Sequence, residues 1–163
     1  MRLITRSDFD GLACAALLEE LGIINEVFYT HPKDIQDGKI KVGPNDVLAN
    51  VPFVEGCGLW FDHHSSEQER LNLKDKFKGA CEMEPSAARV IYNYYRKDPA
   101  AGSKLSRFEE MLSAVDKADS AKYTKEDIQD PHGWMLLAFI ADPRTGLGYK
   151  HTFRTVSYTH LTL

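Results

Sequence analysis

Two aspartates near the N-terminus have the types and spacing that metal chemistry needs. Asp8 and Asp10 are separated by one residue, precede Gly11, and follow the apolar run 3–5. Carboxylates this close repel each other unless a cation lies between them, and hard divalent metals are their natural partners. Taken alone, the same residues fit a turn in which one aspartate caps a helix equally well.

A second cluster, Asp62, His63 and His64, follows the apolar run 59–61. Adjacent residues of an extended strand point in opposite directions, so the two histidines need not serve one metal. One imidazole can bind a metal while the other contacts substrate. A solvated loop is the alternative, but a charged triplet at the mouth of a buried strand is costly without a partner.

A third pair, Asp116 and Asp119, has helical i, i+3 spacing, which places both carboxylates on one side of a helix. Taken alone, this pair is better explained as part of a solvated helix face. Beside the two other clusters, it completes an order of motifs that a known family shares.

The elements that must position these residues begin with apolar runs that predict strands. The runs are 3–5, 27–29, 47–51 and 59–61. They are apolar on both faces, which suits a parallel sheet covered by helices. We therefore expect an α/β fold with a parallel, Rossmann-like sheet, whose strand ends carry the polar clusters where open sheets bind ligands.

Helical patterns follow the first strand and fill the second half of the chain. Apolar spacing predicts a helix over 12–21 that Gly22 closes. Further helices are expected from Pro85, over 108–115 and over 132–141. The C-terminal half should therefore be helical and flank the sheet.

The composition restricts the partners that the protein can have. The chain has 163 residues, a net charge of −4 and 43% hydrophobic residues, which is typical of one globular domain. This acidity gives no general attraction to membranes or long duplex nucleic acid, so a phosphate substrate must be held locally. Three cysteines without CxxC spacing indicate reduced thiols, and we expect a cytoplasmic protein.

The order of these motifs resembles the DHH phosphoesterase family, in particular its exopolyphosphatase-related branch. Segments 4–12 and 59–67 carry the resemblance, which extends to about Thr155. It implies metal-dependent hydrolysis of a phosphoester or phosphoanhydride of the polyphosphate, short oligonucleotide or cyclic dinucleotide type. Mn²⁺, or Mg²⁺, is the implied cofactor, and a homodimer is compatible with the family.

The resemblance also implies a role for each polar residue. His64 would contact the substrate phosphate, and Asp62 would orient the histidines. The implied metal ligands are Asp8, Asp10, His63 and Asp119, with Asp116 as the alternative to Asp119.

Two departures from the family pattern leave open whether one or two metals bind. Asn50 stands where the family often has an aspartate that bridges two metals, and Arg6 stands near the position of a family histidine. Arg6 could instead pair with phosphate directly. Arg144, in a glycine-bearing loop, is a further candidate for contact with substrate phosphate.

The expected mechanism is attack on phosphorus by a metal-activated water, with His64, Arg6 and Arg144 stabilising charge on the phosphate oxygens. One alternative is a non-catalytic, nucleotide- or polyphosphate-binding regulatory domain. A lesser alternative is a haloacid-dehalogenase-like phosphatase in which Asp8 is the nucleophile, because 8–11 resembles that nucleophile loop.

The domain boundaries expected from the sequence follow the resemblance. Residues 1–155 would form the N-terminal phosphoesterase domain, and the second, substrate-binding domain of the family would be absent. No Asp or Glu occurs from 143 to 163, and the Thr-rich end resembles read-through of a cloning adaptor. We therefore expect 156–163 to be a non-native tail.

Overall fold

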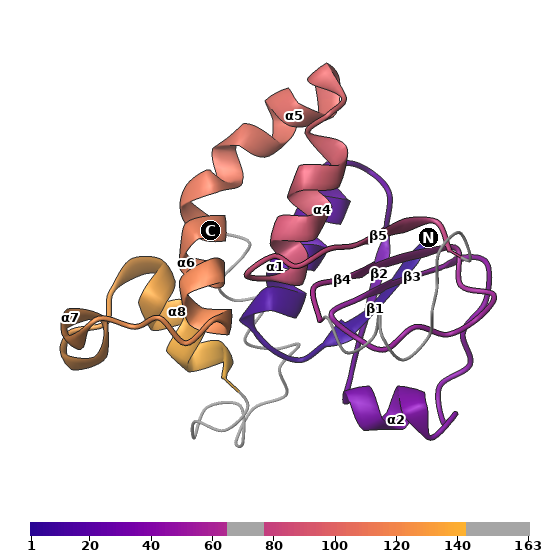
Figure 1. Ribbon diagram of the computed structural model, residues 1–163, viewed down its shortest axis with the longest axis horizontal. Coiled ribbons are helices and arrows are strands. Elements are labelled where there is room, and N and C mark those ends of the chain that lie inside the picture. Colours follow the sequence, from indigo (N-terminus) through magenta and orange to yellow (C-terminus); the bar gives the residue numbers. More distant parts are fainter. Residues whose placement is uncertain (65–76, 143–163) are drawn as a thin grey trace.

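Five parallel strands form the sheet, in the order β2-β1-β3-β4-β5. A computed structural model describes residues 1–64 and 77–142, and Figure 1 shows the elements along the chain. The parallel sheet with flanking helices confirms the predicted α/β fold. The strands are β1 (Arg2–Arg6), β2 (Glu26–Thr30), β3 (Asp46–Ala49), β4 (Leu59–Asp62) and β5 (Gly79–Cys81).

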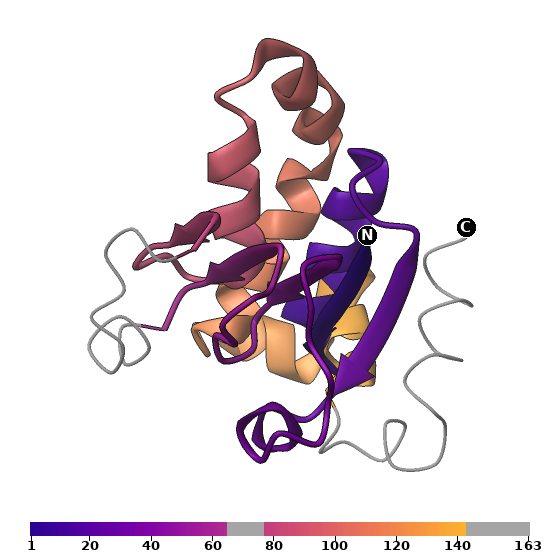
Figure 2. The same cartoon turned by 90° about the vertical axis from the view of Figure 1, so that its right-hand side faces the viewer.

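The helices cover the two faces of the sheet unequally. Figures 1 and 2 show α1, α4, α6 and α8 gathered on one side of the sheet and the short α2 on the other. The helices are α1 (Phe9–Glu20), α2 (Pro32–Gln36), α4 (Ala87–Tyr95), α5 (Pro99–Leu105), the 3₁₀ turn η1 (Ser106–Phe108), α6 (Glu109–Asp119), α7 (Lys125–Gln129) and α8 (Gly133–Ala141).

Each central strand alternates its side chains between two apolar layers. Leu3 of β1 and Val47 of β3 are partners in register and face the layer that α1, α4, α6 and α8 build. Ile4 and Leu48, the next pair, face the layer that contains Ile35 of α2. Both faces of β1 and β3 are thus buried, which is why the interiors of these central strands are mainly apolar.

The connections place a topological switch point at the carboxyl ends of β1 and β3. From β1 the chain crosses through α1 to β2, and from β2 it crosses through α2 to β3 on the other side of β1. Open α/β sheets bind ligands where the winding direction changes in this way. Asp8 follows β1 and Asn50 follows β3, so both lie at this switch point.

Several helix ends differ from the sequence predictions. Helix α1 begins at Phe9, because the Asp8 carboxylate accepts a hydrogen bond from the Gly11 amide at 2.9 Å and caps the helix there. Asp10 therefore lies in the first helical turn and not in a loop. Helix α4 begins at Ala87 with Ser86 as its N-cap, two residues after the predicted start at Pro85.

The predictions at Gly22 and over 132–141 agree with the structure. Gly22 follows α1 with a φ of +69°, a left-handed conformation suited to glycine, and α8 occupies Gly133–Ala141. The elements β5, α2, α5 and α7 were not predicted, because three to seven residues are too few to show a periodic pattern. Among the described residues, no helix has the length and apolar character needed to cross a membrane. Arg144 and the expected tail lie outside the described residues.

Candidate metal centre

Three side chains from distant parts of the chain meet at the carboxyl end of the sheet. Asp10 comes from α1, His63 from the segment after β4, and Asp119 from the last residue of α6. The Nε2 atom of His63 lies 3.2 Å from Asp119 Oδ2 and 3.9 Å from Asp10 Oδ2. Their donor atoms are close enough together to hold one metal ion.

The tautomer of His63 decides how this group can act. Its Nδ1 atom lies 3.2 Å from the carbonyl oxygen of Glu84, which can only accept, so Nδ1 carries the proton. In the neutral imidazole, Nε2 then presents a lone pair. This atom is buried and has no hydrogen-bond partner within the described residues. A lone pair that faces two carboxylates is unfavourable unless a cation or a proton lies between them, so the donor set fits a divalent metal.

Asp10 is held by the start of helix α4. Its carboxylate oxygens accept hydrogen bonds from the amides of Ala87 at 2.9 Å and Ala88 at 2.8 Å. Burial raises the pKa of Asp10 well above its ordinary value, and the nearby charges of Asp119 and Asp8 raise it further. The two amides act in the opposite direction. Asp10 is therefore an oriented carboxylate that gains from a nearby cation.

Asp8 lies beside this group and is already surrounded by partners. Its Oδ1 atom accepts from the Gly11 amide and, at 3.1 Å, from Asn50 Nδ2, while Oδ2 lies 2.9 Å from Arg6 Nε. Burial raises the pKa of Asp8, although the Gly11 amide and Arg6 partly offset this effect. The chain itself thus supplies part of the positive charge that Asp8 needs.

Asn50 occupies an unusual backbone position at the end of β3. Its φ is +55°, in the left-handed region that asparagine tolerates better than most residues. Its Oδ1 atom is buried and, within 1–64 and 77–142, has no hydrogen-bond partner. This oxygen, like His63 Nε2, is a buried acceptor that a bound ligand could satisfy.

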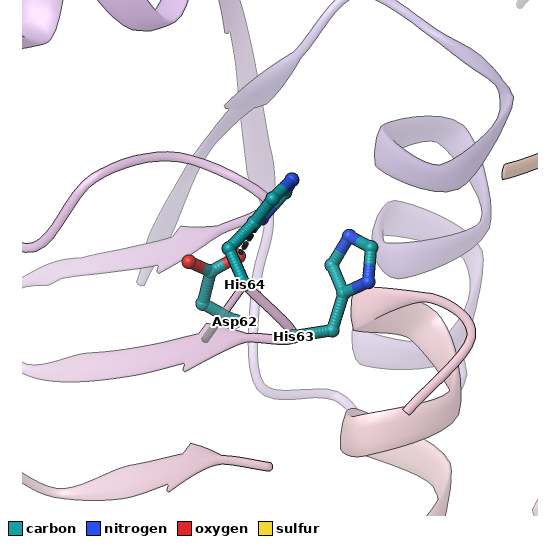
Figure 3. Close-up of side chains that lie close together, drawn as sticks. All are labelled: Asp62, His63 and His64. Atoms are coloured by element: carbon teal, nitrogen blue, oxygen red, sulfur yellow. Dashed lines mark hydrogen bonds and ion pairs between the residues drawn. The ribbon is translucent and has the colours of Figure 1, made fainter. Parts of the chain in front are cut away.

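Asp62 and His64 form a pair next to the metal group (Figure 3). His64 Nδ1 lies 2.9 Å from the buried Asp62 Oδ1, and this hydrogen bond is the main cause of a raised pKa at His64. The His63 and His64 rings lie 4.2 Å apart, because β4 ends at Asp62 and strand alternation does not continue past it. The two histidines are therefore neighbours with different partners.

Asp116 is not brought to this cluster. Its Oδ1 atom accepts from Ser86 Oγ at 2.7 Å, and its Oδ2 atom pairs with the Arg89 guanidinium, also at 2.7 Å. Of the two carboxylates considered from the sequence, Asp119 is the one near His63 and Asp10. Spacing alone could not separate them, because the choice depends on Arg89, which lies on another helix.

A cleft of about 680 Å³ opens beside the metal group, within the size range of small-molecule sites. His31 also lines this cleft, although it was not predicted from the sequence. Its position directly after β2, like that of Asp8 after β1, could have identified it as a site residue. The Glu84 carbonyl and the Ala87 and Ala88 amides also contact site residues, but they are backbone groups, so no residue type indicates them. The polar lining also includes Arg6, Asp8, Asp10 and Asp119, and the apolar lining includes Val115, Ala118 and Ala138.

No protein-family model and no curated protein sequence matches the chain. A solved structure does match: the pGpG-specific phosphodiesterase PggH from Vibrio cholerae, with 38% sequence identity and a TM-score of 0.79. This chain is related to a phosphodiesterase. The match covers 97% of the chain and 50% of PggH, so the chain spans half the length of that protein. The likeness to PggH bears on phosphoester chemistry and leaves the exopolyphosphatase-related branch a prediction.

Proposed function

We propose that this chain is the metal-binding part of a DHH-family phosphodiesterase that hydrolyses a short linear dinucleotide such as pGpG. One observation carries the proposal: the His63 Nε2 lone pair faces the Asp10 and Asp119 carboxylates in a buried setting. The likeness to PggH over nearly the whole chain supports the class of reaction and of substrate.

Asp10, His63 and Asp119 would hold Mn²⁺ or Mg²⁺. Such an ion supplies, when bound, a water of lowered pKa and positive charge for a phosphoryl oxygen. Asp8 lies beside this group, and its contacts with Arg6 and Asn50 reduce the need for a second ion there. We therefore propose one tightly held metal.

His64 and Arg6 would bind the phosphate. The hydrogen bond that His64 Nδ1 donates to Asp62 orients the imidazole and raises its pKa, so the half-exposed ring can donate to a phosphate oxygen in its charged form. Arg6 lines the cleft and remains partly exposed while it pairs with Asp8, so its guanidinium retains donors for a phosphate.

The geometry does not favour Asp8 as a covalent nucleophile. Both of its oxygens are engaged, one by Gly11 and Asn50 and the other by Arg6. A nucleophilic carboxylate needs an oxygen free to attack phosphorus. Trapping an aspartyl-phosphate at Asp8 would nevertheless revive the haloacid-dehalogenase-like alternative.

The proposal is tested by measuring hydrolysis of pGpG, a cyclic dinucleotide, pyrophosphate and polyphosphate with Mn²⁺. The parent is compared with Asp10→Ala and His63→Ala, and with His132→Ala as a control at an exposed histidine outside the cleft. We expect pGpG hydrolysis to fall at least about 100-fold in the first two variants only. Equal activity in all variants would refute the proposal, whereas Mn²⁺ binding without hydrolysis of any substrate would favour a regulatory, ligand-binding domain.

A further inference from the structure

A group of charged and polar side chains outside the metal centre joins helices α4 and α6. The Arg89 guanidinium contacts Asp116 through Nε at 2.8 Å and Nη2 at 2.7 Å, and contacts Glu109 through Nη1 at 3.2 Å. The Ser86 hydroxyl donates to Asp116 Oδ1 at 2.7 Å. Asp116 thus binds two side chains of α4 with its two oxygens.

Ser86 is also the N-cap of α4, which links this group to the start of the helix. Its Oγ atom accepts from the Arg89 amide at 3.1 Å while its hydroxyl proton goes to Asp116. The amides of Ala87 and Ala88, the next two residues, are the ones that hold both oxygens of Asp10. Whatever fixes the first turn of α4 therefore fixes the orientation of the Asp10 carboxylate.

The other end of the contact lies on the helix that carries Asp119. Asp116 precedes Asp119 by three residues in α6, so the two carboxylates are about one turn apart. A series of contacts therefore runs from Asp10 through the start of α4 to Asp116 and along α6 to Asp119. His63 Nε2 lies between the two ends of this series, 3.9 Å from Asp10 Oδ2 and 3.2 Å from Asp119 Oδ2.

We propose that Asp116 is a positioning residue that sets the gap between Asp10 and Asp119 by holding the start of α4 against α6. The inference rests on the proposed function, because that gap is where the metal would bind. It assigns Asp116 to the site without making it a ligand: Arg89 and Ser86 occupy its oxygens. Arg89 serves this role through its planar fork, which a lysine cannot reproduce.

The first measurement is the dissociation constant of Mn²⁺ by calorimetry for the parent, Asp116→Asn, Arg89→Lys and Glu109→Gln. Asn at 116 keeps an acceptor for Ser86 but loses the charge that holds Arg89. We expect about a 10-fold weaker affinity for Asp116→Asn and a smaller loss for Arg89→Lys. Glu109→Gln is the matched control, because Glu109 contacts the same guanidinium at an exposed end and does not touch Ser86. Its affinity should stay within about twofold of the parent.

The second measurement does not involve a metal. Hydrogen exchange of the Ala87 and Ala88 amides, followed by NMR, reports how firmly α4 holds Asp10. We expect at least about tenfold faster exchange at these two amides in Asp116→Asn, and unchanged exchange in Glu109→Gln. If Asp116→Asn does not fold, Arg89→Lys decides the matter by the same two measurements.

The outcomes separate this inference from the proposed function. A parent that binds no Mn²⁺ would refute the metal centre, and the exchange rates would still support or overturn the positioning role. Unchanged exchange at both amides in folded Asp116→Asn overturns the inference. So does an unchanged Mn²⁺ affinity in that variant when the parent binds the ion. A uniform fall in Tm for all three variants with unaltered affinity would make the cluster merely structural, which also overturns it.

Discussion

At the scale of the residue, Asp119 has opposite effects on stability and on metal binding. Burial raises its pKa, which means that its charge is unfavourable where it stands in the metal-free protein. In Asp119→Asn the buried charge and its repulsion of Asp10 are removed, and the amide can donate to the lone pair of His63 Nε2, which lies 3.2 Å from Asp119 Oδ2. We expect Tm in EDTA to rise by about 2–4 °C, the shift that ~1 kcal/mol produces in a chain of this size. Mn²⁺ affinity should fall at least about 10-fold by calorimetry, and a variant that loses Tm but keeps affinity would contradict this account.

Asn50 allows the reverse change, in which a carboxylate is added beside the metal group and not removed from it. Asn50→Asp removes the hydrogen bond that Nδ2 donates to Asp8 at 3.1 Å and places a like charge there. We expect the metal-free variant to unfold at a lower temperature and its Mn²⁺ affinity to rise several-fold, because a carboxylate binds the ion better than an amide oxygen. Relative to the parent, the Tm of Asn50→Asp should fall in EDTA and rise in saturating Mn²⁺. The same direction in both conditions would show that Asn50 lies too far from the ion to matter.

The buried carboxylates also fix the sign of the pH dependence. Burial raises the pKa values of Asp8, Asp10 and Asp119 above 3.8, so between 3.8 and the raised values the folded chain holds more protons than the unfolded chain. The free energy of unfolding therefore falls as the pH rises through that window. His64, with a pKa raised above 6.5, adds stability that is lost as the pH rises through its own raised value.

We therefore expect Tm in EDTA to be higher at about pH 5 than at about pH 8. Metal binding should show the opposite trend, because the ion displaces the protons that the cluster holds. Calorimetric titrations in buffers of different ionisation enthalpy would detect the released protons. An increase of metal-free Tm with pH over this range would contradict the assignment of these carboxylates as raised-pKa groups.

At the scale of the element, the close approach of α1 to β1 determines where Asp8 and Asp10 lie. A Cβ at Gly11 would overlap with the Arg6 carbonyl oxygen, so only glycine lets the helix begin there. Gly11→Ala should push the start of α1 away from β1 and lower the free energy of unfolding by about 1–3 kcal/mol. It should also weaken Mn²⁺ binding, because the Gly11 amide orients Asp8 and the same first turn of α1 carries Asp10.

Gly43→Ala provides the matched control for this change. A Cβ at Gly43 meets nothing within 4 Å, so urea unfolding and Mn²⁺ titration should both match the parent. If Gly11→Ala were as stable as Gly43→Ala, the contact between α1 and β1 would be looser than the structure indicates.

The elements also explain how much of the site could be predicted from the sequence. The strands could be predicted from their apolar runs. Because Asp8 and Asp62 lie at strand ends, they could also be assigned to the same carboxyl-end edge of the parallel sheet. The partners of His63 and Asp10 could not be predicted, because the Glu84 carbonyl and the Ala87 amide are backbone groups placed by the packing of α4. The choice of Asp119 over Asp116 depends on the packing of α4 against α6, which one sequence does not reveal.

At the scale of the whole molecule, the donors of the proposed metal centre all come from the described residues, between Asp10 in α1 and Asp119 in α6. Metal binding can therefore be measured on this chain, although it spans half the length of PggH. Within the described part of the chain, the cationic neighbours of this centre are mainly Arg6 and His64, and the full sequence has a net charge of −4.

This charge distribution predicts a preference for short substrates. A long single strand gains affinity by contacting many cations, but two cationic groups engage only about two phosphates, and the cleft of about 680 Å³ has the size of a small-molecule site. We expect kcat/KM for pGpG to exceed that for a 20-nucleotide single strand at least about 100-fold, with a five-nucleotide strand in between. The logarithm of the apparent affinity should fall with the logarithm of salt concentration with a slope near −1.4, about −0.7 for each of two phosphates. Activity that rises with strand length, or a slope several times steeper, would require a cationic surface that these residues do not provide, and would contradict a dinucleotide substrate.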